Sequence, residues 1–280
     1  MREMGETLRT TFRRMLRLEN RRAAVRPGRL EKITAFQSAI FGNTREITIY
    51  LPAGYDERED RRYPVLYMHD GQNLFEGHRA FVPGNDWRLA DAANAAIGDR
   101  TAAPAIIVGL DHAGPARVDE YTPTRDEARN AGGRAAEHAR MLFEELKPVI
   151  DERFRTLSEE TFVGGSSLGG LVSIFLALHR PDVVRGALVM SPSVWWNGKT
   201  ILGDVDAFSG ERRPRLWLDI GGREGIEALE DARLLRDRLR AKGWRDDEDF
   251  RYYEDRRADH SERAWASRVR KALEFLFPPT

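Results

Sequence analysis

The stretch "TFVGGSSLGGLVSIFLALH", residues 161–179, joins a short apolar run to a longer one through "GGSSLGG" at residues 164–170. The first run is typical of a short buried strand, and the second has the length of a helix that is apolar on nearly every side. Glycine and serine between them favour a tight turn from strand to helix. Such a turn either only connects two buried elements or also holds one serine where chemistry can reach it.

Strands and helices alternate on both sides of this turn. Two alternating segments separated by "FGNT" predict an opening antiparallel hairpin. Apolar periodicity predicts strands at residues 32–40, 45–52, 63–70, 103–111, 161–164, 186–192, 214–221 and 249–255, and helices at residues 87–97, 134–154, 167–180, 224–243 and 261–277. This order predicts an α/β fold with a mostly parallel central sheet, helices on both faces and antiparallel N-terminal strands. Ligands of such sheets bind beyond the carboxyl ends of the strands.

Three segments fall outside this alternation. Residues 114–133 have no clear period and are expected to form a long loop, and residues 198–213 are expected to form a surface connection. Residues 1–28 carry apolar side chains at helical spacing among many arginines, which predicts a basic amphipathic helical extension. This extension is expected to pack on its own domain, with an anionic membrane or a second subunit of a homodimer as the alternatives. Residues 29–280 are expected to form one domain.

Composition narrows the function classes. The 280 residues include 45 basic and 45 acidic side chains and no cysteine. The balanced charge argues against nucleic acid as the main partner, and the missing cysteines exclude disulfides and thiolate metal sites. No apolar run approaches the ~20 residues of a membrane helix, and the charged first residues do not resemble a secretory signal. The expected location is cytoplasmic.

The central turn contains one G-x-S-x-G frame, from Gly165 to Gly169, which centres Ser167. A strand before this pentapeptide and a helix after it are the context of a nucleophile elbow. The glycines allow the strand and the helix to pass close together, and the helix start supplies free N–H groups. The sequence therefore predicts Ser167 as a nucleophile, with a plain structural turn as the alternative.

A serine nucleophile needs a base, and an acid that orients the base. His179 and His260 follow Ser167, and His179 lies well inside the predicted helix. His260 follows the last predicted strand, at the expected end of the sheet, and is predicted to be the base. Glu224 lies just beyond the strand "PRLWLDIG" and is the favoured acid, with Asp219, inside that strand, as the second candidate.

Acyl transfer also needs N–H donors for an oxyanion. The amide of Leu168, directly after the nucleophile, is one predicted donor, and the amide of Gln72 in "MHDGQNLF" is the other. Gly71 is expected to permit an unusual backbone in that loop. A metal or acid–base role for His69 and Asp70 is the weaker alternative, because no further ligand cluster accompanies them.

Six segments in chain order carry a resemblance to a known family: "YMHDGQNLF", "RVDEYTP", "GGSSLGG", "SPSVWW", "LDIGGREG" and "DHSERAW". From about residue 44 to residue 277, the chain resembles the "putative esterase" family of the α/β-hydrolase fold, which includes enterochelin esterases, feruloyl esterases and S-formylglutathione hydrolases. The resemblance implies a triad of Ser167, Glu224 and His260, and oxyanion donors at Leu168 and Gln72.

The resemblance also implies roles outside the triad. Trp195 or Trp196 is expected to line the acyl pocket, with a core aromatic pair as the alternative. Arg117 is expected to bind a polar or acidic part of the substrate, with an ion pair to Glu120 as the alternative.

Together these features predict a serine carboxylic-ester hydrolase that acts on small-molecule esters through an acyl-enzyme, without a metal or cofactor. An acyltransferase with the same triad, which passes the acyl group to a sugar or alcohol, is the first alternative. A non-catalytic binding protein on the same fold is the second. The natural acyl and alcohol groups depend on loops that have no sequence period.

Overall fold

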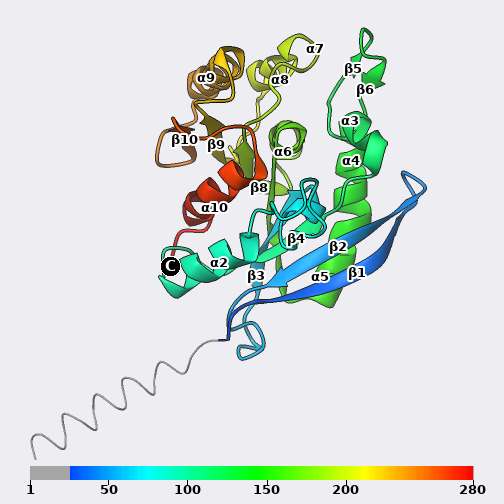
Figure 1. Ribbon diagram of the computed structural model, residues 1–280, viewed down its shortest axis with the longest axis vertical. Coiled ribbons are helices and arrows are strands. Elements are labelled where there is room, and N and C mark those ends of the chain that lie inside the picture. The colour runs from blue at the N-terminus through cyan, green and yellow to red at the C-terminus, as the bar shows by residue number, and fades with distance from the viewer. Residues whose placement is uncertain (1–25, 280) are drawn as a thin grey trace, which may run out of the picture.

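The computed structural model of the chain describes residues 26–279, which build one eight-stranded mixed sheet (Figure 1). The strand order is β1-β2-β4-β3-β7-β8-β9-β10, in which β1 pairs with β2 and β2 pairs with β4 antiparallel, and all other pairs are parallel. The strands are β1 (Arg29–Ser38), β2 (Asn43–Leu51), β3 (Tyr63–His69), β4 (Ile106–Leu110), β7 (Thr156–Ser166), β8 (Val184–Met190), β9 (Arg215–Gly221) and β10 (Phe250–Asp255). The predicted α/β architecture is confirmed.

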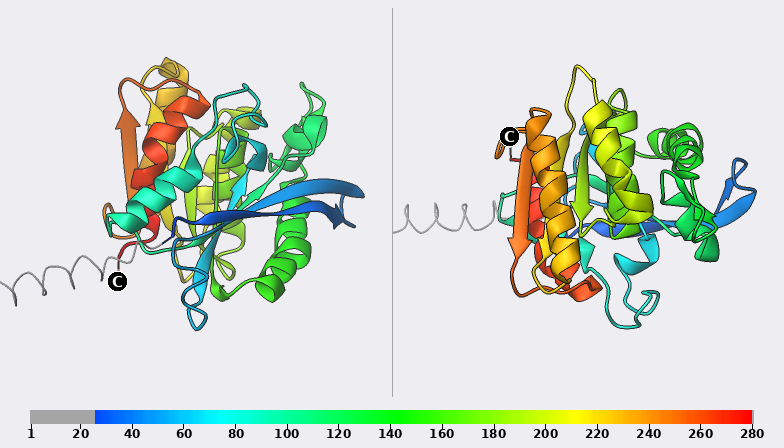
Figure 2. Two further views of the ribbon diagram at one scale, coloured as in Figure 1. Left: turned by 60° about the horizontal axis from the view of Figure 1, so that its bottom comes forward. Right: turned by 90° about the horizontal axis from the view of Figure 1, so that it is seen from above.

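Helices cover both faces of the sheet (Figure 2). One face carries α2 (Leu89–Gly98) and α10 (Glu262–Leu276), which pack against each other. The other face carries α4 (Ala135–Arg140), the π-helical turn η3 (Met141–Leu146), α5 (Lys147–Arg153), α6 (Leu168–His179), α8 (Ile201–Ala207) and α9 (Ile226–Ala241). Strand alternation separates the two cores, since Leu216 and Leu218 of β9 join one apolar cluster and Trp217 joins the other.

The segments expected to form a long loop and a surface connection contain short elements. Residues 114–133 form η2 (Gly114–Ala116), α3 (Arg117–Glu120) and a two-stranded ribbon of β5 (Arg125–Asp126) and β6 (Ala131–Gly132). Residues 198–213 include the end of α7 (Trp196–Lys199) and all of α8. The long loop expected at residues 114–133 was wrong because a distant contact stabilises these turns: Glu120 of α3 forms a buried ion pair with Arg45 of β2. Residues 198–213 do connect β8 to β9, and part of this connection is helical.

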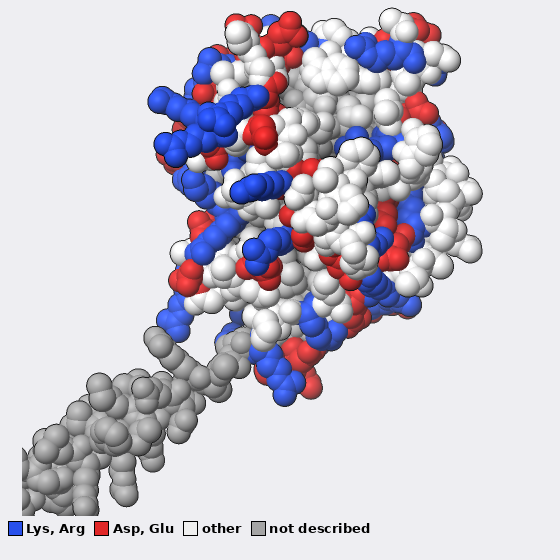
Figure 3. Space-filling view, viewed as in Figure 1, with Lys and Arg blue, Asp and Glu red and all other residues white. Residues whose placement is uncertain are grey.

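The predicted N-terminal extension lies almost entirely outside the described residues, so its helical form and its role as a dimer contact stay predictions. Within residues 26–279, no helix combines the length and the apolar character that a membrane span requires. Basic and acidic side chains are interspersed over the face shown in Figure 3. Many of them pair with each other, as Arg233 does with Glu254 at 2.8 Å.

Candidate active site

Ser167 lies at the junction between β7 and α6, in a backbone conformation that few side chains adopt. Its φ is 57° and its ψ is −122°, a strained conformation for a non-glycine residue. The strand and the helix pass so closely that a Cβ at Gly165 would lie 2.9 Å from the carbonyl carbon of Gly169. The Ser167 Oγ lies 3.3 Å from the Ser193 Oγ, which belongs to the loop after β8. The G-x-S-x-G frame therefore forms the sharp strand-to-helix turn that the sequence predicts.

His260 and Glu224 meet at the carboxyl ends of β9 and β10. The His260 Nδ1 lies 2.6 Å from Glu224 Oε2. The other carboxylate oxygen, Oε1, accepts hydrogen bonds from the Gly221 amide at 2.7 Å and the Ser191 hydroxyl at 2.6 Å. The Glu224 side chain is only 1% exposed, whereas that of His260 is 45% exposed. With its N–H on Nδ1, the imidazole turns an unprotonated Nε2 away from the carboxylate.

Asp219, the second candidate acid, lies inside β9. Within residues 26–279, no hydrogen bond joins its side chain to His260. Its Oδ1 accepts a hydrogen bond from Arg268 at 3.0 Å, and its Oδ2 accepts one from the Trp217 indole at 2.8 Å. The side chains of Asp219 and Arg268 are at most 1% exposed. Burial raises the pKa of the Asp219 carboxyl, a shift that the adjacent Arg268 guanidinium opposes.

Three residues that support Glu224 were missed by the sequence reasoning. The Ser191 hydroxyl that donates to Glu224 also accepts hydrogen bonds from the Trp265 indole and from Arg268, both at 3.0 Å. The Trp265 ring meets the His260 ring edge-on, with 4.9 Å between the ring centres. The segments "SPSVWW" and "DHSERAW" contain Ser191 and Trp265, but they do not show that the two side chains meet.

Gln72 lies in the turn η1 (Gly71–Asn73), directly after β3. The left-handed residue of this turn is Asp70, with φ 58°, and not Gly71 as expected. Gly71 is required for space instead, because a Cβ there would lie 2.6 Å from the carbonyl carbon of Gly109 in β4. The amides of Gln72 and Leu168 have no hydrogen-bond partner among the residues that the structure describes.

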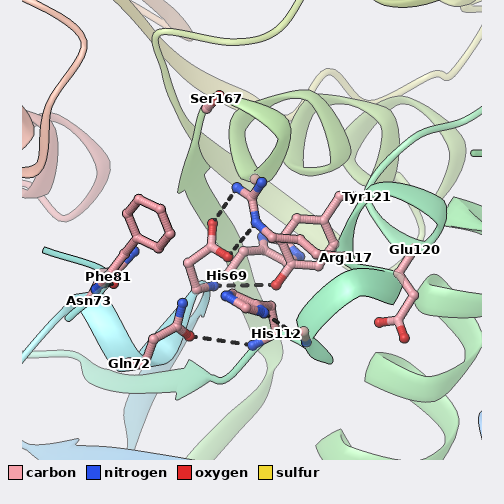
Figure 4. Close-up of polar contacts among 12 residues, drawn as sticks. His69, Gln72, Asn73, Phe81, His112, Arg117, Glu120, Tyr121 and Ser167 are labelled. Carbon is pink, nitrogen blue, oxygen red and sulfur yellow. Dashed lines mark hydrogen bonds and ion pairs between the residues drawn. The ribbon is translucent and has the colours of Figure 1, made fainter. Parts of the chain in front are cut away.

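The turn at η1 packs against the first turn of α6. A Cβ at Gly169 would lie 3.2 Å from the His69 Cβ and 3.3 Å from Asp70 Oδ2. Figure 4 shows Ser167, Gln72 and Arg117 in one close-up of this junction between the turn and the helix. The amide that follows Ser167 and the amide of Gln72 therefore belong to two turns that contact each other.

Arg117 pairs with Asp70 and not with Glu120. Its Nε and Nη2 donate to the two oxygens of Asp70, both at 2.7 Å. Glu120 accepts hydrogen bonds from Arg45 at 2.7 and 2.8 Å in the interior. The alternative expectation of an Arg117–Glu120 pair was wrong because the two side chains extend from α3 toward different partners, Arg117 toward Asp70 and Glu120 toward Arg45. The expected contact of Arg117 with substrate stays a prediction.

The two adjacent tryptophans differ in environment. Trp196 is 2% exposed, and its indole donates to the carbonyl of Thr124 at 2.8 Å, which makes it a core residue. Trp195 is 45% exposed, with the Arg129 guanidinium 5.2 Å from its ring centre. Phe81, which was not predicted from the sequence, is 79% exposed. Its backbone amide donates a hydrogen bond to Asn73 Oδ1 of η1 at 2.8 Å (Figure 4).

Two histidines are buried behind the turn, where their rings form a triangle with Tyr121. The ring centres of His69 and His138 lie 5.1 Å apart, and His69 Nδ1 donates to the Gly164 carbonyl at 2.8 Å. Burial, followed by the neighbouring His138, lowers the pKa of His69 well below its usual range. Among residues 26–279, no group of three or more histidine, aspartate or glutamate side chains is arranged to hold a metal ion.

We expect His69→Asn to weaken the acid sensitivity of folding. A buried neutral histidine binds a proton only on unfolding, so its stabilisation is present above the unfolded pKa and is lost as the pH falls. Between pH 7.5 and 5.5 the wild type should lose about 1.4 kcal/mol more than the variant, for an unfolded pKa of about 6.5. The asparagine amide replaces the Nδ1 donor to Gly164. Urea unfolding at both pH values checks this, and equal losses would contradict it.

Comparison with known proteins gives one family and several relatives. A family model described as "Putative esterase" matches residues 38–276. The chain is 25% identical to the Uncharacterized protein YbbA of Bacillus subtilis, over 83% of this chain and 92% of that one. It is 30% identical to the Ferri-bacillibactin esterase BesA of the same organism, over 52% of this chain and 53% of that one. The crystal structure of the BES protein from Bacillus cereus aligns with a TM-score of 0.71 at 23% identity, over 90% of this chain and 95% of that one, which shows the same fold.

Proposed function

The chain belongs to the family described as "Putative esterase" and is an ester-hydrolysing enzyme, and from this premise we propose that Ser167 is its nucleophile and His260 its general base. The observation that carries the proposal is the 2.6 Å contact between His260 Nδ1 and Glu224. It fixes the tautomer in which Nε2 can take a proton. The strained conformation of Ser167 at the start of α6 adds support.

In the proposed acylation step, the Ser167 Oγ attacks the ester carbonyl carbon and transfers its proton to His260 Nε2. The electron pair of the carbonyl moves to its oxygen, and the amides of Leu168 and Gln72 stabilise the resulting oxyanion. The carbonyl then reforms, the bond to the alcohol oxygen breaks, and the imidazolium protonates the departing alcohol. Glu224 stabilises the positive charge that His260 carries between these events.

Deacylation repeats the same steps with water. His260 removes a proton from a water molecule, whose oxygen attacks the acyl carbon and forms a second oxyanion at the same amides. When this intermediate collapses, the bond to the Ser167 Oγ breaks and His260 returns its proton to the serine. The products are a carboxylic acid and an alcohol.

The proposed substrates are small-molecule esters, with siderophore esters as the first natural class to test. BesA is named for ferri-bacillibactin and a relative from Emericella nidulans for siderophore enterobactin, and these names motivate this class. We propose that the exposed rings of Trp195 and Phe81 contact the substrate, because both belong to loops connected to the site. Exposed aromatic rings stack readily on aromatic acyl groups.

A covalent probe tests the nucleophile directly. We expect a p-nitrophenyl alkylphosphonate to release about one nitrophenol for each protein chain, since phosphonylation blocks a serine esterase after one turnover. Mass spectrometry of the digested protein should then place the phosphonyl group on Ser167. Hydrolysis of p-nitrophenyl esters from acetate to octanoate provides the matching activity. Label on another residue in an active preparation would overturn the assignment.

A further inference from the structure

The charged pair of Asp70 and Arg117 lies beside the proposed oxyanion site. Asp70 immediately precedes η1 and has a left-handed backbone, which aspartate tolerates better than most side chains do. Both oxygens of its carboxylate bind Arg117 at 2.7 Å, in the bidentate geometry that gives arginine its directional strength. The pair is largely shielded from solvent, since the side chains are 8% and 24% exposed.

The segment that supplies Arg117 holds the turn at a second point and is itself anchored in the core. The Tyr121 hydroxyl, at the end of α3, accepts a hydrogen bond from the Asp70 amide at 3.3 Å. The Arg117 guanidinium lies 5.1 Å from the centre of the Tyr121 ring. Glu120, between these two residues, is fixed by its buried pair with Arg45. The side chain of Asp70 is therefore held by Arg117 of α3, and its amide by Tyr121 directly after α3 (Figure 4).

The Asp70 carboxylate also lies where its charge matters for catalysis. Its Oδ2 would be 3.3 Å from a Cβ at Gly169, the second residue of α6, so it faces the helix start that presents the Leu168 amide. A carboxylate at this point opposes the formation of a second negative charge nearby. The Arg117 guanidinium cancels that charge while it holds the turn that presents the Gln72 amide.

We propose that Arg117 is a positioning residue for ester hydrolysis, which fixes the Asp70–Gln72 turn and neutralises Asp70 beside the oxyanion. This inference rests on the proposed serine mechanism. It differs from the expected contact between Arg117 and an acidic substrate, because the partner of Nε and Nη2 is the Asp70 carboxylate of the protein itself. It predicts that Arg117 acts on every ester, including those without charge.

The test uses a double-mutant cycle with neutral p-nitrophenyl acetate. We expect Arg117→Met to lower kcat about 10- to 100-fold with KM changed less than about 3-fold, because the loss falls on the transition state. Asp70→Asn keeps the left-handed residue and removes the charge, and should cost less than about 10-fold. The double variant should be more active than Arg117→Met alone, since the uncompensated carboxylate is gone. Arg117→Lys, which restores the charge without the bidentate geometry, should be intermediate.

A trifluoromethyl ketone, which forms an oxyanion adduct with a serine nucleophile, gives the second measurement. The inhibition constant of this ketone should rise in Arg117→Met by about the same factor by which kcat/KM falls. An unchanged kcat and inhibition constant, or a double variant that is no better than Arg117→Met, would overturn the positioning role. Phosphonate labelling of the wild type separates the two proposals, because absence of label on Ser167 defeats the serine mechanism itself. Should Arg117→Met fail to fold, kcat and the inhibition constant of Arg117→Lys and Asp70→Asn test the positioning role instead.

Discussion

Replacement of Ser167 by alanine should reduce ester turnover by at least about 1,000-fold, since removal of a nucleophile leaves only binding and oxyanion stabilisation. The variant should fold normally in spite of the strained position. Alanine is smaller than serine, and the described hydrogen bond of the Ser167 Oγ goes only to the Ser193 Oγ at 3.3 Å. Initial rates with p-nitrophenyl acetate, compared at equal active protein, measure the effect.

Ser193→Ala provides the matched control for this prediction. It removes the hydroxyl that contacts Ser167 from a different loop, so it changes the same surroundings without removing the proposed nucleophile. We expect its turnover to stay within about 10-fold of the wild type. Ser167→Ala protein that is free of contaminating esterase and keeps more than a few per cent of wild-type turnover would exclude Ser167 as the nucleophile. A Ser193→Ala loss as large as that of Ser167→Ala would shift attention to Ser193.

The architecture could be predicted from the sequence because its elements have local signals. In the segment "TFVGGSSLGGLVSIFLALH", apolar periodicity and the placement of glycines predict the strand, the turn and the helix. The position of His260 followed from chain order and from the rule that loops after parallel strands meet at one edge of the sheet. These arguments need no knowledge of individual contacts.

Pairing between distant side chains could not be predicted in the same way. Arg117 has Glu120 three residues away, and the local sequence offers that pair as an alternative, yet the structure pairs Arg117 with Asp70, 47 positions earlier. The support of Glu224 by Ser191 likewise joins residues 33 positions apart. Such contacts depend on the arrangement of the strand ends in space, which leaves no periodic trace in the chain.

Replacement of Glu224 should lower turnover, whereas replacement of Asp219 should lower stability. Glu224→Gln keeps the side-chain shape and can still accept hydrogen bonds from Gly221 and Ser191 through its oxygen. Its amide nitrogen then faces His260 Nδ1 and favours the tautomer that carries the proton on Nε2. We therefore expect kcat to fall about 100- to 10,000-fold, somewhat less than for Ser167→Ala, with little change in stability. Steady-state kinetics and urea unfolding measure the two quantities.

Asp219→Asn is the matched variant, and it should show the opposite pattern. It leaves Arg268 buried without the full charge of its partner, a loss that costs about 3 kcal/mol of unfolding free energy. The contact between His260 and Glu224 is untouched, so turnover well below the melting temperature should stay within about 10-fold of the wild type. If Glu224→Gln were fully active and Asp219→Asn inactive but stable, the orienting acid would be Asp219. If both variants kept normal turnover, no orienting carboxylate would be required at this histidine.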